Sequence, residues 1–343
     1  MAQTERSLRY PARGPCPWTR AVAGLVLLVL GTLHASSAAL GQDPGPLPDN
    51  VMEGWKVFAR KQCIQCHAVC GLGGQVGPDL GRTEQQGLTA GKLAGTLWNH
   101  IPTMYSHMLR HRVDYPRLTP AEVSDLFSFL FFVRYLDEPG NPAVGERLLR
   151  QKGCAQCHAT EGRLDESAPD LKRWAGYGNP IVWAQKMWER APAMEQAMQR
   201  AGLTWPQLDD RDLVNIIAYL RSIGGQDTTI YLQPGSAKTG ARLFVERKCQ
   251  SCHYNGGPGK DLAATPPPRS LAGLASRMWN HSPEMTRLMR TQGIERSPLT
   301  AQEMADITAY VIFLRYEDRG GNPQRGRKVL EAKQCTQCHL EAP

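Results

Sequence analysis

The chain has 343 residues, and its apolar and charged fractions are those of a globular protein, which excludes a disordered or fibrous chain. Its formal net charge is +8, and a basic protein invites comparison with nucleic-acid-binding proteins. No cluster of Lys and Arg stands out after residue 40, so nucleic acid is not expected as a partner.

The N-terminal residues have the pattern of an export signal. Four Arg and an apolar run at 21–33 are followed by small residues at 35–39. We therefore expect a cleaved signal peptide at 1–40 and a periplasmic or otherwise exported bacterial protein. An uncleaved membrane anchor is the alternative, but the run is shorter than the roughly 20 residues that span a bilayer. No later segment is apolar enough to span, so no stable membrane span is expected after cleavage.

Eight of the ten cysteines belong to four C-x-x-C-H pentads, which begin at Cys63, Cys154, Cys249 and Cys335. The pentads recur about every ninety residues, which indicates a repeated domain. The complete units are 47–139, 140–232 and 234–320, and residues 321–343 form the opening of a fourth. Cys16 lies in the signal, and Cys70 is left as a free thiol near the first pentad, to which we assign no role.

Each complete unit is predicted to begin and end with a helix. A Gly nine residues before the pentad shares one face of the opening helix with an apolar residue four positions later. The closing helix carries an aromatic residue at a matching position. Because Gly lets another helix approach closely, we expect the helices to cross at these pairs: Gly54 and Phe129, Gly145 and Tyr219, Gly240 and Tyr310. The fourth unit has only the Gly, at Gly326.

The pentads indicate covalent c-type haem. In C-x-x-C-H the two thiols add to the haem vinyl groups, and the adjacent His becomes the proximal iron ligand. Zinc sites and thiol redox sites also use C-x-x-C, but four copies in register in an exported chain favour haem. The predicted attachment residues are Cys63, Cys66, Cys154, Cys157, Cys249, Cys252, Cys335 and Cys338. The predicted proximal ligands are His67, His158, His253 and His339.

The sixth iron ligand is predicted to be Met. Between residues 142 and 232 the only His is His158, so the second haem cannot take two His from its own unit, and a thioether is the natural alternative. Aligned Met residues occur in two registers. We favour Met104, Met194 and Met285; the alternative is Met108, Met198 and Met289, one helical turn later.

Other aligned residues receive weaker roles. Because the second unit has Arg190 where the first and third have His100 and His281, these two His are expected near the surface or the haem propionates rather than on iron. Trp98, Trp188 and Trp279 recur in every complete unit, where haem packing and ordinary core packing are equally good interpretations.

A Pro eleven residues after the pentad His is expected to place its carbonyl oxygen on the imidazole N–H. This residue is Pro78 in the first unit and Pro169 in the second. A plain turn proline is the alternative interpretation. In the third unit the corresponding segment is shifted, and the acceptor is not specified by the sequence.

Over about residues 50–320 the chain resembles class I cytochrome c domains joined in tandem, as in bacterial multihaem c-type cytochromes. The resemblance rests on the helix Gly, the pentad, the G-P-D-L turn at 77–80, the Met and the aromatic closing helix. It implies all-α domains, each wrapped around one haem, with the Pro carbonyl on the proximal His. The short interval from Asn99 to Met104 also resembles the family, whereas the second unit departs from it with Glu189 in place of Asn.

The leading functional hypothesis is electron transfer between redox partner proteins. A cytochrome subunit of a dehydrogenase or oxidoreductase complex is the alternative, and a haem enzyme such as a peroxidase is less favoured because Met on the iron leaves no open position. The fourth unit has four residues after His339. We expect either that the sequence is a fragment of a longer protein or that this haem sits at an open edge.

Overall fold

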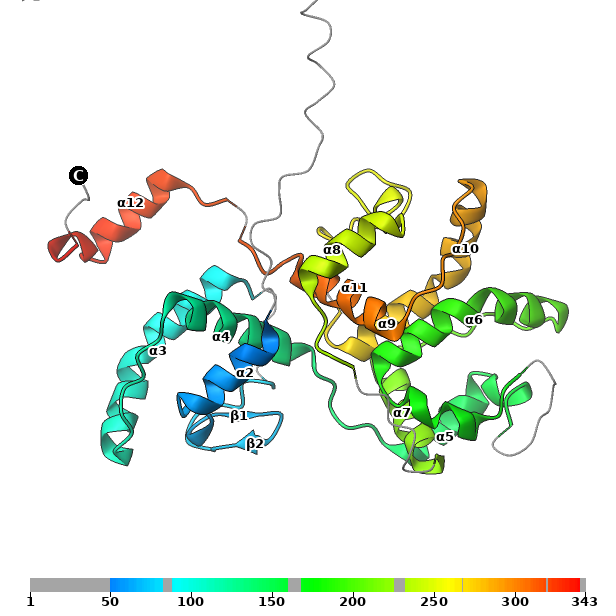
Figure 1. The fold of residues 1–343 in the computed structure, drawn as a ribbon, viewed down its shortest axis with the longest axis horizontal. Coiled ribbons are helices and arrows are strands. Elements are labelled where there is room, and N and C mark those ends of the chain that lie inside the picture. The colour runs from blue at the N-terminus through cyan, green and yellow to red at the C-terminus, as the bar shows by residue number, and fades with distance from the viewer. Residues whose placement is uncertain are drawn as a thin grey trace, which may run out of the picture. The chain divides into compact units, whose positions relative to one another are not determined.

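The structure is a computed structural model that describes residues 50–82, 88–159, 168–224, 232–266, 268–318 and 320–339. Helices dominate these segments (Figure 1), which confirms the predicted all-α class. The predicted signal peptide lies outside the described residues. Within the described ranges, no helix is both long enough and apolar enough to cross a membrane.

The elements follow the predicted repeat. The first unit contains α2 (Val51–Arg60), η1 (Cys63–Gln65), β1 (Ala68–Val69), β2 (Leu72–Gly73), α3 (Ala90–His111), α4 (Pro120–Phe132) and η2 (Val133–Tyr135). The second contains α5 (Pro142–Gln151), η3 (Cys154–Gln156), η4 (Leu171–Tyr177), α6 (Pro180–Arg200) and α7 (Asp210–Ile223). The third contains α8 (Ala237–Glu246), η6 (Cys249–Ser251), α9 (Leu271–Asn280), α10 (Ser282–Thr291) and α11 (Ala301–Phe313). The fourth contains α12 (Pro323–Ala332) and η7 (Cys335–Gln337). The antiparallel hairpin of β1 and β2 pairs Ala68 with Gly73 and Val69 with Leu72.

The opening and closing helices of each complete unit cross at the predicted glycines. A Cβ added to Gly54 or Gly145 would lie 2.0 Å from a backbone carbonyl oxygen of the closing helix, and at Gly240 the distance is 1.9 Å. Real Cβ atoms do not approach so closely, so only Gly fits. The aromatic partners Phe129, Tyr219 and Tyr310 lie at the same crossings. The expected crossing is confirmed in all three complete units.

A buried polar side chain ties each crossing to the start of the opening helix in the second and third units. The side-chain Oδ1 of Asn215 accepts from the backbone N–H of Asn141 at 2.8 Å, and the Asp306 carboxylate accepts from that of Ser236 at 2.8 Å. Asn141 and Ser236 are themselves the N-caps of α5 and α8. One polar residue on the closing helix therefore fixes where the opening helix begins.

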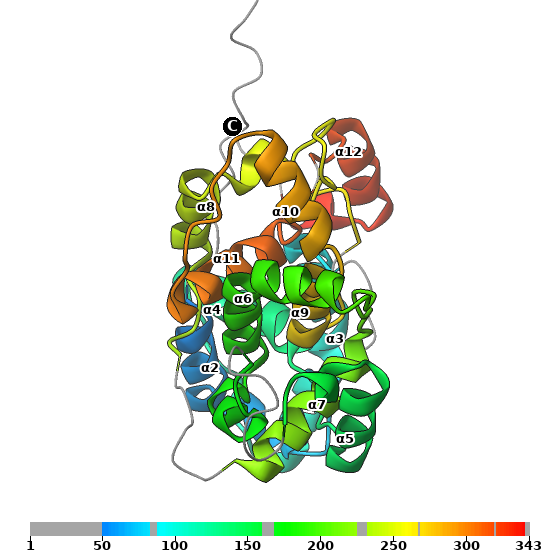
Figure 2. The same cartoon turned by 90° about the vertical axis from the view of Figure 1, so that its right-hand side faces the viewer.

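The second and third units pack together through α6 and α9, which lie side by side in Figures 1 and 2. The contact is reciprocal. The indole N–H of Trp188 donates to the Ser297 carbonyl at 2.9 Å, and that of Trp279 donates to the Pro206 carbonyl at 2.7 Å. Because both Trp make the same kind of contact with the other unit, they have a packing role between units. In the first unit, Trp98 is 72% exposed.

A Pro four residues after each of these Trp adds to the same contact. Pro has no N–H, so the Trp carbonyl loses its usual partner within the helix. The freed carbonyls accept hydrogen bonds from the other unit: Trp188 from Arg296 at 2.9 Å, and Trp279 from the Trp205 indole at 3.0 Å. The Arg296 guanidinium also lies 4.2 Å from the centre of the Trp188 ring.

The first and third units pack through α4 and the C-terminal end of α11. The rings of Phe131 and Phe313 are stacked with centres 5.2 Å apart, and Tyr316 meets Phe131 edge-on at 5.2 Å. Both Phe side chains are almost fully buried. Asp137 accepts the backbone N–H of Ala272 at the start of α9. The third unit therefore contacts both of the others.

The first turn of α4 gives a prediction about acid stability. Thr119 and Glu122 form a capping box, and Arg60 and Lys61 at the end of α2 pair with the same carboxylate. The Thr119 backbone hydrogen bond, then Arg60, then Lys61 lower the pKa of Glu122 to about 2. A lowered folded-state pKa stabilises the fold above the ordinary carboxyl pKa of 4.5, and this stabilisation is lost as the pH falls toward 2.

Glu122→Gln is therefore expected to lower stability at pH 7 and to weaken the loss of stability between about pH 5 and pH 2. Denaturant titrations at several pH values measure this. Glu331→Gln on exposed α12 removes the same charge and serves as the control. Equal acid sensitivity in the Glu122 variant and the parent chain would contradict the capping role.

Candidate functional site

The four pentads fold into the same local loop. The residue before the first Cys has a positive φ, between 57° and 80°, and a short 3-10 turn follows. The backbone N–H of the pentad His then donates to the carbonyl of the first Cys, at 2.9–3.1 Å. This turn brings both thiols and the imidazole to one loop. Since the fourth pentad adopts it too, the loop does not depend on a complete unit.

The two thiols of a pentad differ in surroundings. Cys63, Cys154 and Cys249, the first of each pair, pack against the hydrophobic core clusters. Burial raises the pKa of Cys63, and it raises the pKa of Cys154 and of Cys249 to about 11. These thiols are neutral at physiological pH. A group attached through them is anchored against the apolar interior of its unit.

The pentad His in each complete unit is oriented by a backbone carbonyl. The Nδ1 atom of His67 lies 3.0 Å from the Pro78 oxygen, and that of His158 lies 3.0 Å from the Pro169 oxygen. With Nδ1 donating to the carbonyl, the Nε2 lone pair is available for a metal. That these His hold iron stays a prediction.

The third unit uses a different residue for the same purpose. His253 Nδ1 lies 2.9 Å from the Lys260 carbonyl oxygen. Sequence reasoning missed this acceptor because the loop is shorter here and no Pro stands eleven residues on. The Gly directly before the acceptor residue could have indicated it, because this Gly packs against the pentad His. Cβ atoms at Gly77 and at Gly259 would lie 2.4 and 3.2 Å from the His67 and His253 rings.

Asp79 holds the loop that presents Pro78. Its carboxylate accepts the backbone N–H groups of Cys70 at 2.9 Å, Gly71 at 2.7 Å and Gly81 at 2.9 Å. These bonds join the hairpin after the first pentad to the segment containing Pro78. Asp79 was part of the G-P-D-L turn in the sequence, but its structural task was not predicted. Burial raises the pKa of the Cys70 thiol, with Asp79 adding to the effect.

A second aromatic ring stands next to the pentad His of each complete unit. In the first unit it is His100, whose ring centre lies 6.1 Å from that of His67, and in the third it is His281, 6.2 Å from His253. In the second unit Trp174 meets His158 edge-on at 4.7 Å. His281 is exposed, as expected for a surface residue, and His100 is partly buried; their contacts with the pentad His were not predicted.

The candidate Met ligands lie on three helices that follow the pentads in the chain. Met104 and Met108 are on α3, Met194 and Met198 are on α6, and Met285 and Met289 are on α10. All six are partly buried, so exposure does not separate the two registers. Met194 packs against the hydrophobic core. Met285 lines a narrow space between α6 and α9–α10. The Met assignments stay predictions.

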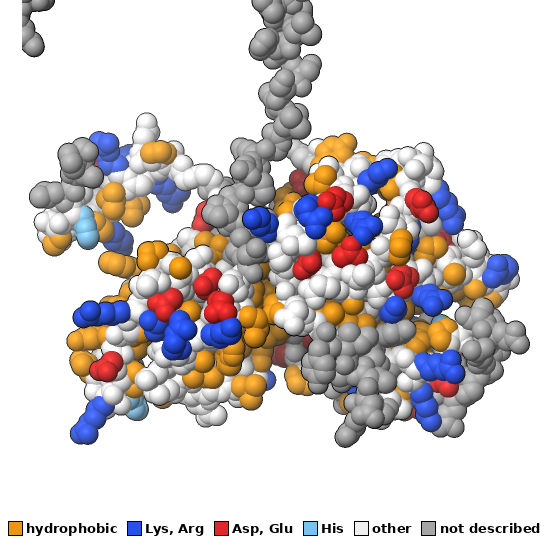
Figure 3. Space-filling model, viewed as in Figure 1, with side chains coloured by type: hydrophobic (Ala, Val, Ile, Leu, Met, Phe, Trp, Pro, Cys, Tyr) orange, Lys and Arg blue, Asp and Glu red, His pale blue; other side chains and the backbone are white. Residues whose placement is uncertain are grey.

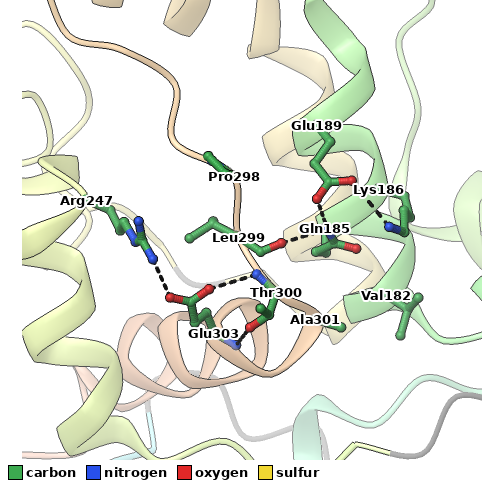
Figure 4. A pocket seen from close by; sticks show the side chains of 10 residues that line it. All are labelled: Val182, Gln185, Lys186, Glu189, Arg247, Pro298, Leu299, Thr300, Ala301 and Glu303. Atoms are coloured by element: carbon green, nitrogen blue, oxygen red, sulfur yellow. Dashed lines mark hydrogen bonds and ion pairs between the residues drawn. The ribbon is translucent and has the colours of Figure 1, made fainter.

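An open cleft lies between the second and third units, at α6 and the start of α11 (Figure 4). Its charged side chains pair with one another: Arg247 with Glu303, and Lys186 with Glu189. The Gln185 amide donates to the Leu299 carbonyl across it at 2.7 Å. No pentad residue lines it. We interpret the cleft as part of the contact between units.

Comparison with known families identifies the central part of the chain. Residues 142–224 and 237–313 each match the family model described as Cytochrome c. The two consecutive matches support cytochrome c domains in tandem over these segments. They coincide with the second and third units, in which the pentad His, the crossing Gly and the closing helix were found above. No curated protein and no solved structure matches the chain at a significant level.

Cytochrome c domains transfer electrons through a covalently bound c-type haem, and the side chains present fit that group. Each complete unit offers two thiols and a His held at Nδ1, which is the donor set that haem c requires. Both matches agree with the cytochrome c resemblance predicted for the second and third units. The wider resemblance to bacterial multihaem cytochromes stays a proposal.

Proposed function

We propose that the chain is an exported electron-transfer protein that carries one haem c in each of its three complete units, with an attachment site for a fourth. The observation that carries the proposal is that all four pentads fold into the same loop. Only two of these pentads lie in the segments that match the Cytochrome c model. The repeat extends the same chemistry to the first and fourth units.

The proposed attachment residues are the eight pentad Cys, and the proposed proximal ligands are His67, His158, His253 and His339. When bound, haem supplies a one-electron redox centre. In the complete units the protein orients the imidazoles through the carbonyls of Pro78, Pro169 and Lys260, and it partly buries the first Cys of each pentad. In the second unit we propose Met194 as the sixth ligand, with Met198 as the alternative.

The packing between units supports transfer within the chain. The third unit contacts the second through Trp188 and Trp279, and the first through Phe131 and Phe313. These contacts are largely buried, so they hold the units close together. We propose that electrons pass between the units and that the partners are redox proteins in the periplasm. On the face drawn in Figure 3, Lys and Arg are interspersed with Asp and Glu.

The proposal predicts the haem count. The full chain, matured in a bacterium that attaches c-type haem, is expected to carry at least three covalent haems. Replacing both Cys249 and Cys252 by Ala is expected to remove one haem and leave the others, as measured by haem absorbance per chain and by the mass of the intact protein.

Cys70→Ala is the matched control and is expected to leave the count unchanged. Fewer than three haems in the parent chain would overturn the proposed domain organisation. Stoichiometric zinc in place of haem in metal analysis would show that the pentads are zinc sites instead.

A further inference from the structure

In the first and third units, a second imidazole lies close to the pentad His. It comes from the helical segment that follows the pentad loop in the chain. His100 lies within α3, and His281 lies at the break between α9 and α10. The rings meet at 6.1 and 6.2 Å between centres, with interplanar angles of 63° and 83°. The second unit has Arg190 at the equivalent position. The same arrangement in two units argues that it is built by the repeat.

The spacing is what two imidazoles need to share one metal ion. Metal-to-imidazole bonds are about 2.0–2.1 Å long, so two rings on opposite sides of a metal have centres about 6 Å apart once the radius of each ring is added. Rings that both point at one ion can be twisted about the line joining them. The distances therefore agree with shared ligation, and the interplanar angles place no constraint on it.

Three of the four rings have Nδ1 close to a backbone carbonyl oxygen. His67 and His253 direct Nδ1 at the carbonyls of Pro78 and Lys260. His281 directs its own Nδ1 at the Arg277 carbonyl, one turn back in α9. A carbonyl accepts, so Nδ1 carries the proton in each of these rings and Nε2 is left with its lone pair. In the third unit, both imidazoles of the pair have their orientation fixed by backbone.

The competing Met of the third unit has another task. Met285 lines the narrow space between α6 and α9–α10, together with Met187, Ala191 and Trp279. Three of these four side chains belong to the contact between the second and third units rather than to the pentad. Met285 therefore takes part in that contact as well, whereas His281 does not line this space.

We propose that His100 and His281 are the sixth iron ligands of the first and third haems, so that these two haems have two His ligands and only the second has His and Met. This inference rests on the proposed function, since it requires haem at each pentad. It replaces the expectation of Met104 and Met285. Because Met with His raises the reduction potential, the second haem is then the most easily reduced of the three.

The test uses the full haem-loaded chain and reads the ligands by electron paramagnetic resonance and near-infrared magnetic circular dichroism. The parent chain is expected to give two haems with the signature of two His ligands for each one with His and Met. His281→Ala is expected to remove one of the two-His signals and to give a high-spin haem that binds added imidazole. Met285→Ala, one helical turn away, is the matched control and is expected to keep all three haems low-spin. His100→Ala and Met104→Ala repeat the comparison in the first unit.

Two results would overturn the inference. One is a parent spectrum in which every haem of the complete units shows a Met ligand. This measurement uses the parent chain alone, so it does not depend on whether a variant folds. The other is loss of a low-spin haem in the Met285 variant but not in the His281 variant. Either result with the full haem count leaves the proposed function standing, whereas a chain without covalent haem overturns both.

Discussion

Replacing Gly240 by Ala is expected to destabilise the third unit by about 3 kcal/mol or more, the upper end for overpacked sites. The added Cβ would lie 1.9 Å from the Asp306 carbonyl oxygen and 2.8 Å from the Tyr310 Cβ. Neither atom is the end of a flexible side chain, so α8 and α11 must move apart. Separation also strains the hydrogen bond from Ser236 to the Asp306 side chain.

The chain contains its own control. Gly326 occupies the same place in the repeat, on α12, and no described atom lies within 4 Å of a Cβ there. Gly326→Ala is expected to stabilise the helix by up to about 1 kcal/mol, because Ala favours a helix more than Gly does. Thermal and denaturant unfolding, followed by circular dichroism, compare the two. Equal effects of the two substitutions would show that the crossing does not require Gly.

Met194→Ala is expected to convert the second haem to a five-coordinate, high-spin state and to lower its reduction potential. His158 is the only His between residues 142 and 232, so no second imidazole of this unit can take the place of the thioether. Met194 lies one helical turn after Arg190, the position at which the other units carry His100 and His281. Met194 therefore lies on nearly the same face of α6 as Arg190, the counterpart of His100 on α3.

Met198→Ala is the matched control. If Met194 is the ligand, the control keeps the Met-to-iron charge-transfer band, and the Met194 variant loses it. If only the second haem has Met, the Met194 variant loses the whole band rather than about a third of it. Loss of the band in the Met198 variant would show that the alternative register is correct.

The helices and their crossings were predictable because the repeat supplies an internal alignment. A single Gly in a helix carries little information, but Gly54, Gly145 and Gly240 recur at one register with an aromatic partner near the end of each unit. The pentad chemistry was predictable for the same reason. Local spacing specifies both the helix face and the loop.

The contacts between units left no such signal. Trp188 donates to Ser297 across more than a hundred residues of sequence, and the carbonyl that its neighbouring Pro releases is taken up by Arg296. Nothing local distinguishes this Trp from Trp98, which is exposed. Packing between units depends on surface shape, which spacing along the chain does not encode.

The ring contacts of His100 and His281 with the pentad His were not predicted, for a different reason. The Arg190 at the equivalent position was taken to mean that no unit uses this position for iron. That step assumed that all three units share one ligand set. The structure shows that aligned positions in a repeat can have different surroundings, as the rings beside His67, His158 and His253 do.

The reciprocal contact between the second and third units has the form of a symmetric dimer joined into one chain. In a true homodimer every substitution appears twice, once on each side of the axis. Here each half is encoded separately, so the two halves can carry different residues at matching places. Gln185 and Ser276 are such a pair, and they bond different backbone carbonyls of the opposite unit. A fused dimer of this kind lets one half change its residues while the other keeps the interface, and two neighbouring redox centres can acquire different properties without losing their fixed spacing.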